Sequence, residues 1–231
     1  MTLLLEAREL HTYYGASHVL HGVSFSISEG EMVALMGRNG MGKTTTIRSV
    51  LGLTLPRAGS VLVRGTDVTH WPAHRRAREG LALVPEGRGI FPTLTVQENL
   101  VVAARPGPWT LDRVLSLFPR VRERLHHLGT QLSGGEQQML SIARALMTNP
   151  SLIILDGATE GLAPLVRREI WGALRKLGDE GTAALVVDKE VHTLLDLADR
   201  LLIMVKGRIV FSGNSHDWRS RAEENLALLR A

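Results

Sequence analysis

The chain has 231 residues, of which 44% are hydrophobic and 22% are charged. This is the composition of a folded globular protein, and it excludes global disorder. Cysteine is absent, which excludes disulfides, a thiol nucleophile and a thiolate metal site. A chain of this length accommodates one large domain, or one domain with an inserted subdomain, around a substantial core.

The basic residues are more numerous than the acidic ones, and the net charge is +4. Arginines cluster at residues 75–78 and 120–124, as they do on nucleic-acid-binding surfaces and also on solvated helix faces. No aromatic stacking platform accompanies either cluster, so we predict solvated helix faces and no nucleic-acid partner. The apolar runs are far shorter than the roughly 18 residues of a membrane-spanning helix, and no secretory signal is evident. We therefore expect a soluble, cytoplasmic protein.

Apolar runs punctuated by glycine or proline follow one another along the chain. The first 30 residues or so, including the alternating Val23, Phe25 and Ile27, predict antiparallel strands that flank a sheet. Further strands are predicted at 32–36, 60–63, 81–84, 152–155, 183–187 and 201–205. The last three runs are continuously apolar, which is typical of parallel strands covered on both faces. Helical patterns at 165–177 and 191–198 separate them, so the order predicts an α/β fold with a mainly parallel sheet.

The middle of the chain is different, because residues 93–147 show no strand pattern. Leu111, Val114, Leu115 and Phe118 fall on one helical face, and the segment 139–146 repeats this periodicity. We predict a single domain over 1–231. Its α/β core spans 1–92 and 148–215, a helical subdomain at 93–147 is inserted into the core, and a C-terminal helix spans 216–231.

Residues 37–44 read GRNGMGKT, directly after the predicted strand 32–36 and directly before a predicted helix. This is the P-loop pattern G-x4-G-K-T in the context that it requires. Its glycines let backbone N–H groups turn toward phosphate oxygens, and the helix N-terminus adds partial positive charge. We expect Lys43 to reach the β- and γ-phosphates, Thr44 to suit Mg²⁺ and Thr45 to bond an α-phosphate oxygen. The predicted nucleotide-binding loop comprises Gly37, Arg38, Asn39, Gly40, Met41, Gly42, Lys43, Thr44 and Thr45.

A second glycine-containing motif, LSGGEQQ, occupies residues 132–138 and precedes a helix rich in Met, Leu and Ala. Ser133, Gly134 and Gly135 place a hydroxyl and unhindered N–H groups at a helix N-terminus, which favours anions. A serine N-cap with Glu136 in a capping box explains the helix start, but not the two glycines. We interpret Ser133, Gly134 and Gly135 as a second anion-binding terminus, within the segment that comprises Leu132, Ser133, Gly134, Gly135, Glu136 and Gln137.

Taken together, these motifs resemble the ATP-binding subunit of ABC transporters. GRNGMGKTT resembles the Walker A motif, LSGGEQQ the signature motif, and LIILD at 152–156 the Walker B strand. The resemblance implies that Asp156 directs Mg²⁺ together with Thr44 and Glu86, and that Tyr14 stacks on adenine. The segments 83–100 and 161–164 further resemble the smaller ATP-binding subunit of branched-chain amino acid importers. Related subunits serve urea and short amides.

The resemblance, which runs from about residue 3 to 213, also implies partners. Such subunits dimerise head to tail, and each ATP lies between the Walker A motif of one chain and the signature of the other. Closure of the dimer acts on two membrane permease subunits, through a groove near residues 86–98, and a substrate-binding protein takes part indirectly. We therefore expect an ATPase with ATP and Mg²⁺ as cofactors, in a homodimer or heterodimer at the cytoplasmic face of the membrane.

The catalytic centre departs from this family's pattern. Gly157 stands where the family has its catalytic Glu, and Lys189 aligns with a His that touches the γ-phosphate. Because glycine cannot polarise water, we predict that this chain's own site hydrolyses ATP slowly or not at all. Glu160 is expected to point away from the γ-phosphate, while Asp188 ends a neighbouring strand close to the phosphates and His192 is expected on the surface.

The sequence suggests three candidate functions. The first is the energy-coupling subunit of an importer, and the second is a non-hydrolysing regulatory module or degenerate partner in a heterodimer. The third, a soluble ABC protein acting on ribosomes or DNA, fits poorly. The chain has room for one cassette only, and it has no sustained heptads for a long coiled coil.

Overall fold

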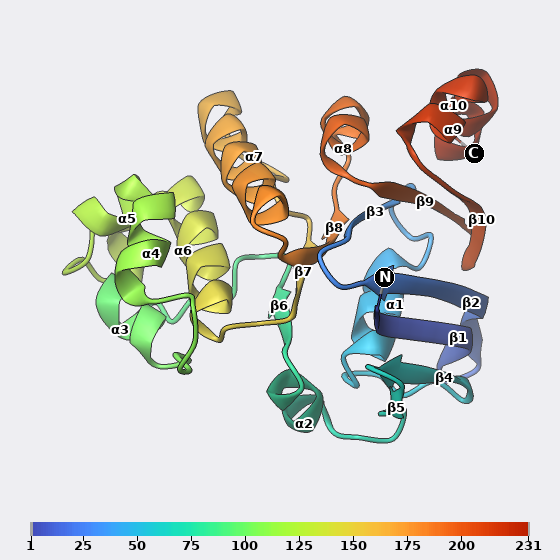
Figure 1. Ribbon diagram of the computed structural model, residues 1–231, viewed down its shortest axis with the longest axis horizontal. Helices are drawn as coiled ribbons and strands as arrows, with labels where there is room; N and C mark the ends of the chain where they lie inside the picture. The colour runs from blue at the N-terminus through green and yellow to red at the C-terminus, as the bar shows by residue number, and fades with distance from the viewer. Residues whose placement is uncertain (1, 231) are drawn as a thin grey trace.

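The computed structural model describes residues 2–230, and its strands form two sheets (Figure 1). The smaller sheet is antiparallel and has the strand order β2-β1-β4-β5. The N-terminal strands predicted from alternating residues are thus confirmed, although they are longer than the alternation indicated. Their bounds are β1 (Leu3–Tyr14), β2 (Ser17–Ser28), β4 (Ala58–Val63) and β5 (Thr66–Asp67).

The central sheet has six strands in the order β10-β9-β3-β8-β7-β6. All neighbours are parallel except β10, which pairs antiparallel with β9. Every residue of β3, β7 and β8 is buried, as continuous apolar runs require. The predicted mainly parallel α/β sheet is confirmed. Its strands are β3 (Met32–Met36), β6 (Leu81–Val84), β7 (Leu152–Asp156), β8 (Ala183–Val187), β9 (Arg200–Val205) and β10 (Arg208–Gly213).

Helices cover the central sheet on one face, and α1 (Lys43–Val50) with the antiparallel sheet covers the other. The alternation of side chains in β3 shows this division. Met32, Ala34 and Met36 belong to the core under the helices, whereas Val33 and Leu35 belong to the core shared with α1. The strands of the central sheet therefore separate two hydrophobic cores.

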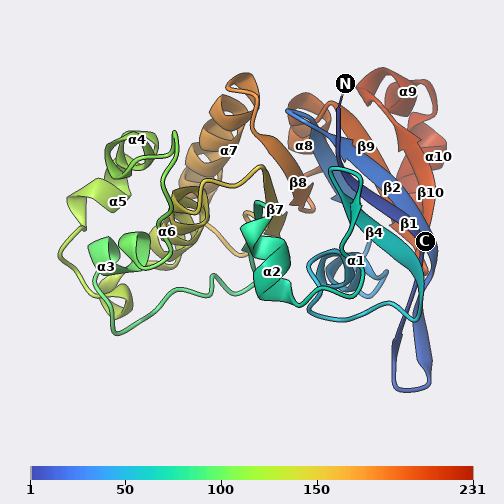
Figure 2. The same cartoon turned by 60° about the horizontal axis from the view of Figure 1, so that its bottom comes forward.

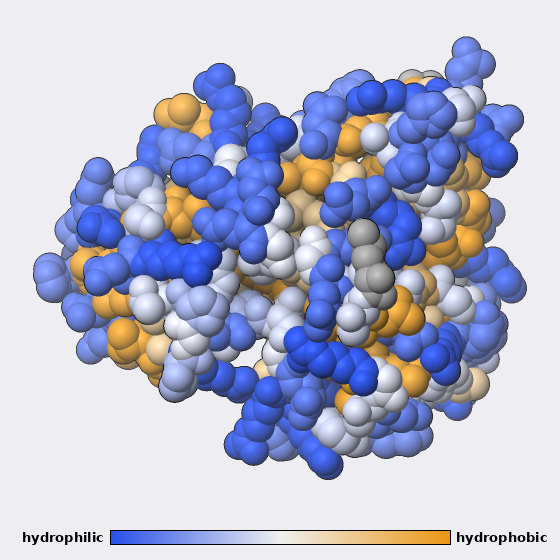
Figure 3. Space-filling view, in the orientation of Figure 1, coloured by the Kyte–Doolittle hydropathy of each residue, from blue (hydrophilic) through white to orange (hydrophobic). Residues whose placement is uncertain are grey.

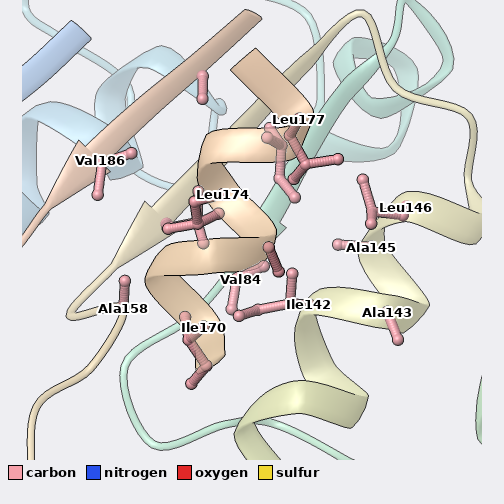
Figure 4. Packing of buried hydrophobic residues seen from close by; sticks show 14 of the residues in the cluster. Val84, Ile142, Ala143, Ala145, Leu146, Ala158, Ile170, Leu174, Leu177 and Val186 are labelled. Carbon is pink, nitrogen blue, oxygen red and sulfur yellow. The ribbon is translucent and has the colours of Figure 1, made fainter. Parts of the chain in front are cut away.

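Helix α7 (Pro164–Asp179) packs between the sheet and α6 (Gly134–Met147), as Figure 4 shows. Ile170, Leu174 and Leu177 lie on one side of α7 and are fully buried, at the spacing of a single helical face. They lie close to Val84 of β6 and Ile142 of α6 in the same cluster (Figure 4). This packing fixes the start of α6, which carries the second motif, relative to the central sheet.

The segment 93–147 is helical, as predicted. It contains α3 (Val96–Val101), α4 (Leu111–Leu117), α5 (Pro119–Glu123), a 3₁₀ helix (Gly129–Gln131) and α6. Its only β pairing is an isolated bridge between Thr95 and Leu128. Figures 1 and 2 show these helices on the side of β7 opposite to α1 and the antiparallel sheet.

The prediction of a single C-terminal helix at 216–231 is wrong. The chain forms two helices, α9 (Ser215–Ser220) and α10 (Ala222–Arg230), separated at Arg221. Asn214 begins α9 with a capping box, and Trp218 is buried edge-on against Phe211 at 5.9 Å between ring centroids. The break at Arg221 lets α10 follow the sheet after Trp218 has been anchored. Residue 231 lies outside the described residues.

The prediction that the arginine clusters lie on solvated faces is wrong for Arg76. This residue of α2 (Ala73–Arg78) is 0% exposed, and its guanidinium donates to the carbonyl oxygens of Trp71, Ser49, Val50 and Thr69. Burial lowers the pKa of Arg76 to about 10. Arg76 therefore binds the carbonyl groups at the end of α1, which sequence periodicity does not reveal.

The molecular face seen in Figure 3 is mainly hydrophilic, with hydrophobic residues in small scattered groups. Within residues 2–230, none of the helices has both the length and the hydropathy needed to span a bilayer. The helix α8 (Val191–Leu197) follows β8.

Candidate functional site

The loops at the carboxyl ends of the central strands enclose a pocket of about 310 Å³. This is the position at which parallel α/β sheets bind ligands, because the strand ends and the following helix N-termini converge there. The loops after β3, β6, β7 and β8 all contribute. The lining residues are Val19, Asn39, Gly40, Gly42, Lys43, Thr44, Thr45, Glu86, Asp156, Gly157, Glu160, Val187, Asp188 and Lys189.

The predicted phosphate loop forms one wall of this pocket and leads directly into α1. Gly37 has a φ of 150°, and a Cβ atom on it would overlap the carbonyl oxygen of Met204. Only glycine fits this close approach of two backbones. Lys43 is the first residue of α1, so the loop ends at a helix N-terminus that faces the pocket.

The ammonium group of Lys43 is held by the loop itself. Its Nζ donates to the carbonyl oxygens of Gly37 at 2.7 Å and of Arg38 at 2.9 Å. Burial lowers the pKa of Lys43, and the nearby Asp156 carboxylate acts in the opposite direction. These bonds hold the positive charge at the mouth of the loop, where an anionic ligand would compete for the same N–H groups.

The three residues predicted to hold magnesium all line the pocket. Asp156 is 6% exposed at the end of β7, and burial raises its pKa, while a hydrogen bond from Thr44 acts against this. Glu86 follows β6 and is exposed at the pocket rim. A desolvated carboxylate beside a hydroxyl suits a hard cation such as Mg²⁺, which prefers oxygen ligands. The residues present therefore fit the predicted metal.

Four of the predicted nucleotide-binding residues, Tyr14, Gly37, Arg38 and Met41, do not line the pocket. Arg38 and Met41 contribute carbonyl oxygens, which accept hydrogen bonds from Lys43 Nζ and from the Gly207 amide. Tyr14 ends β1 beside the pocket and is 46% exposed. Burial alone would raise the pKa of Tyr14, but its hydrogen bonds to Thr54 and Thr45 outweigh this and lower it. Its ring is accessible next to the α1 residue Thr45.

The second motif begins α6 as predicted, with a capping box. Ser133 Oγ accepts from the Glu136 amide at 3.3 Å, and Glu136 Oε2 accepts from the Ser133 amide at 2.8 Å. A Cβ atom on Gly134 would lie 2.7 Å from Arg88 Nη2, and one on Gly135 would lie 2.6 Å from Val166. Packing against the branched Val166 side chain therefore requires Gly135, whereas the flexible end of Arg88 can move away from Gly134.

The LSGGEQQ segment takes no part in the phosphate pocket of its own chain. Helix α6 and helix α1 lie on opposite sides of β7 in both views (Figures 1 and 2). Residues 132–137 are absent from the pocket lining. The two predicted anion-binding termini are thus separated within one chain.

Gly157, Glu160 and Lys189 meet at the far end of the pocket. The prediction that Glu160 points away from the phosphates is wrong, because its side chain lines the pocket and forms an ion pair with Lys189. The sequence shows this carboxylate three residues after Gly157, but it does not show the turn of the loop that brings Glu160 back to the pocket. His192, by contrast, is exposed as predicted.

Asp188 also lines the pocket, but its carboxylate is occupied. Oδ2 accepts from the amide and the hydroxyl of Thr159, both at 2.8 Å. Oδ1 accepts from the amides of Lys189 at 2.7 Å and Glu190 at 3.2 Å. These four hydrogen bonds connect the loops after β7 and β8 through Asp188. They occupy the lone pairs of both carboxylate oxygens, so Asp188 is not free to accept a proton from water.

Comparison with known proteins identifies this arrangement. The sequence profile of the ABC transporter family matches residues 20–160. The chain belongs to the ABC transporter family. Among its ABC relatives, the high-affinity branched-chain amino acid transport ATP-binding protein BraG of Pseudomonas aeruginosa is 39% identical over 215 residues, which cover 90% of this chain and 91% of that protein. The predicted resemblance is therefore confirmed.

Other ABC proteins are similar over nearly the same length. The probable branched-chain amino acid transport ATP-binding protein LivF of Archaeoglobus fulgidus is 32% identical, with 93% of both chains covered. The Nod factor export ATP-binding protein I of Rhizobium etli is 36% identical over 88% of this chain and 66% of that protein.

Solved structures of ABC proteins have the same fold. The ATP-binding subunit of an ABC transporter is 29% identical, covers 99% of this chain and 100% of its own, and has a TM-score of 0.87. A dimeric ATP-binding cassette in a post-hydrolysis state, bound to ADP and Pi, is 26% identical and has a TM-score of 0.80. The match covers 92% of this chain and 99% of that chain. The predicted fold class, a P-loop α/β core with its flanking elements, is confirmed.

Proposed function

We propose that the chain is the ATP-binding, energy-coupling subunit of an importer for branched-chain amino acids. The observation that carries this proposal is its similarity, over nine tenths of its length, to two proteins named for branched-chain amino acid transport. The pocket chemistry agrees with a nucleotide ligand, because glycine-rich backbone, a lysine and a helix N-terminus converge on one cavity.

ATP is the proposed ligand of this pocket. The loop from Gly37 to Thr45 cradles the phosphates, Lys43 attracts their charge, and Tyr14 offers an accessible ring to adenine. Thr44, Asp156 and Glu86 would hold Mg²⁺, which supplies charge neutralisation of the phosphate oxygens when bound. The cation would offset the unfavourable burial of the Asp156 carboxylate, because an opposite charge favours its ionised form.

The working form is proposed to be a head-to-tail dimer. The signature residues Ser133 to Gln137 lie away from their own chain's phosphate pocket, which leaves them available to a nucleotide held by a partner chain. A dimeric cassette with ADP and Pi is known for a relative of similar fold. The partner is either a second copy or a different ATP-binding subunit.

Hydrolysis at the chain's own site is proposed to be slow. Gly157 supplies no carboxylate after Asp156, and loss of a general base costs about 10²- to 10⁴-fold in rate. Turnover would then occur mainly at the partner's site, which uses the partner's Walker motifs with this chain's LSGGEQQ segment. A non-hydrolysing regulatory module is the second candidate, because the same departure at Gly157 favours it.

The membrane arrangement belongs to the same proposal. Two permease subunits would contact the loop at 86–98, where Phe91 is exposed, and a substrate-binding protein would act through them. The chain would lie as a peripheral subunit at the cytoplasmic face of the membrane. Urea or short amides are the alternative cargo.

Uptake in the native host tests this proposal. Deletion of the gene should abolish high-affinity uptake of labelled leucine, and the wild-type gene should restore it. The Lys43→Ala gene should not, since the variant loses the ammonium that faces the phosphates. Loss of urea uptake instead would assign the alternative cargo. Unchanged uptake of both compounds would contradict an importer.

Calorimetry on the purified chain tests the nucleotide site separately. ATP should bind the wild-type chain and bind Lys43→Ala at least about 100-fold more weakly, equivalent to about 2.7 kcal/mol. Lys176→Ala, which removes an exposed lysine of α7 far from the loop, serves as the matched control. Equal ATP affinity of Lys43→Ala and the wild type would show that the site is assigned wrongly.

A further inference from the structure

The pocket contains a carboxylate next to the place where a catalytic Glu is missing. A Cβ atom on Gly157 would have Glu160 Oε2 as its nearest neighbour, at 3.7 Å. Glu86 brings only its Cγ atom near the same point, at 3.9 Å. Apart from the adjoining Asp156, the described carboxylate oxygen closest to this position therefore belongs to Glu160.

The backbone at Gly157 makes room for this carboxylate. Its φ of 69° lies in the left-handed region, and its amide donates to the Val187 carbonyl at 3.0 Å. With no side chain at 157, the loop after β7 turns so that Glu160 fills the pocket wall. Asp188 cannot take this role, because its oxygens already accept four hydrogen bonds.

Lys189 holds the Glu160 carboxylate in an ion pair across the pocket wall. The ammonium contacts Oε1 of Glu160, so this contact restrains the carboxylate at the pocket wall. That hydrogen bond raises the pKa of Lys189, and the Coulomb attraction of Glu160, Asp188 and Glu86 acts in the same direction. Lys43 and Asp156 complete the charged groups of the pocket. The ammonium therefore stays charged around neutral pH, and a competing anion can draw it from Glu160.

We propose that Glu160 is the general base of this chain's own site and that Lys189 restrains it. This proposal rests on the proposed function, since it explains the slow ATP hydrolysis by the restraint that Lys189 places on Glu160. When ATP is bound, its γ-phosphate competes with Glu160 for the Lys189 ammonium and frees the carboxylate in only a fraction of the ATP-bound chains. A released Glu160 carboxylate accepts a proton from water as the water oxygen bonds to the γ-phosphorus. The bond from that phosphorus to the bridging oxygen breaks, ADP leaves with the electron pair, and Glu160 returns the proton to solvent.

Steady-state phosphate release by the purified chain with Mg-ATP tests this assignment. Lys189→Gln should raise kcat about tenfold, because the base is released, and should raise KM, because an attraction to the γ-phosphate is lost. Glu160→Gln added to Lys189→Gln should remove that rise. Arg167→Gln is the matched control, because it breaks the neighbouring Arg167–Glu190 ion pair outside the pocket and should leave kcat at the wild-type value.

Two outcomes would overturn the inference. One is a Lys189→Gln chain that binds ATP with kcat at or below the wild-type value. The other is a rise in kcat that persists in the double variant, which would assign the base elsewhere. Neither outcome affects the importer proposal, which depends on leucine uptake and on ATP binding. Conversely, a chain without leucine transport can still give the predicted rise in phosphate release.

Discussion

Arg88 Nη1 donates a 2.9 Å hydrogen bond to Oε1 of Gln137, which joins the loop after β6 to the start of α6. Gln137 Nε2 in turn donates to the carbonyl oxygens of Gly129 at 3.1 Å and Leu132 at 3.3 Å. Glu86, two residues before Arg88, lines the phosphate pocket. A chain of direct contacts thus connects the pocket to the signature segment of the same chain.

Replacing Arg88 tests whether this connection matters for dimer closure. Arg88→Met should weaken ATP-dependent dimerisation about tenfold, or about 1.4 kcal/mol, because α6 loses its bond to the pocket loop. ATP binding by the monomer should change less than about twofold, because Arg88 does not line the pocket. Analytical ultracentrifugation measures the dimerisation, and calorimetry measures the ATP affinity. Arg113→Met, which breaks the exposed Arg113–Glu180 ion pair, is the control. Normal dimerisation of Arg88→Met would contradict a coupling role.

The signature segment is predicted to act on the partner's nucleotide. Ser133→Arg places a long cationic side chain at the N-cap of α6 and removes the hydroxyl that accepts from Glu136. ATP binding by the monomer should be retained, while ATP-dependent dimerisation should be lost. Ser116→Arg, on the exposed side of α4, provides the control. If Ser133→Arg dimerises as the wild type does, the segment does not act in trans.

Restoring a carboxylate after Asp156 should accelerate hydrolysis at the chain's own site. Gly157→Glu is expected to increase phosphate release about 10²-fold, because a general base then adjoins the metal-directing Asp156. Free space around Gly157 accommodates a Cβ atom, but its φ of 69° should cost about 1–2 kcal/mol of folding stability. Steady-state assays and thermal denaturation measure these effects. Rapid hydrolysis by the unmodified chain, abolished by Lys43→Ala, would rule out the predicted slow site.

The Glu31–Arg200 ion pair should contribute to stability in a pH-dependent manner. Burial alone would raise the pKa of Glu31, but hydrogen bonds from Arg200 at 2.7 Å and the Ser28 amide at 2.7 Å outweigh it and lower the pKa. A carboxylate with a lowered folded-state pKa stabilises the protein above its unfolded pKa, near 4.5. This stabilisation is lost as the pH falls through the lower, folded-state pKa.

Urea denaturation of Glu31→Gln measures this contribution. At pH 7 the variant should be less stable by about 1–3 kcal/mol, because the half-buried Arg200 loses its charged acceptor. The difference from the wild type should shrink as the pH falls below about 4.5. Glu29→Gln is the control, because it breaks the Glu29–Arg64 ion pair, which is more exposed than the Glu31–Arg200 pair. It should change stability by less than about 0.5 kcal/mol. An unchanging difference between pH 7 and pH 3 would contradict the assignment.

Much of the fold was predictable because its signals are local. Met32–Met36, Leu81–Val84 and Ala183–Val187 have the bounds that their continuous apolar runs predicted. The predicted phosphate loop precedes α1 because glycines, lysine and helix periodicity lie within a few residues of one another. The replacement of the family's catalytic Glu by Gly157 is also visible in the sequence, because it concerns a single position next to Asp156.

Other features depend on residues that are distant in the chain, and only the tertiary structure decided them. Glu160 lies at the pocket wall in an ion pair with Lys189, which is 29 residues away in the chain. Arg76 is buried because the carbonyls at the end of α1 need donors, and α10 separates from α9 because Trp218 is anchored on β10. Sequence periodicity shows which face of a helix or strand is buried. The partner of a charged side chain depends instead on how separate helices, strands and loops pack together, and no local sequence pattern encodes this packing.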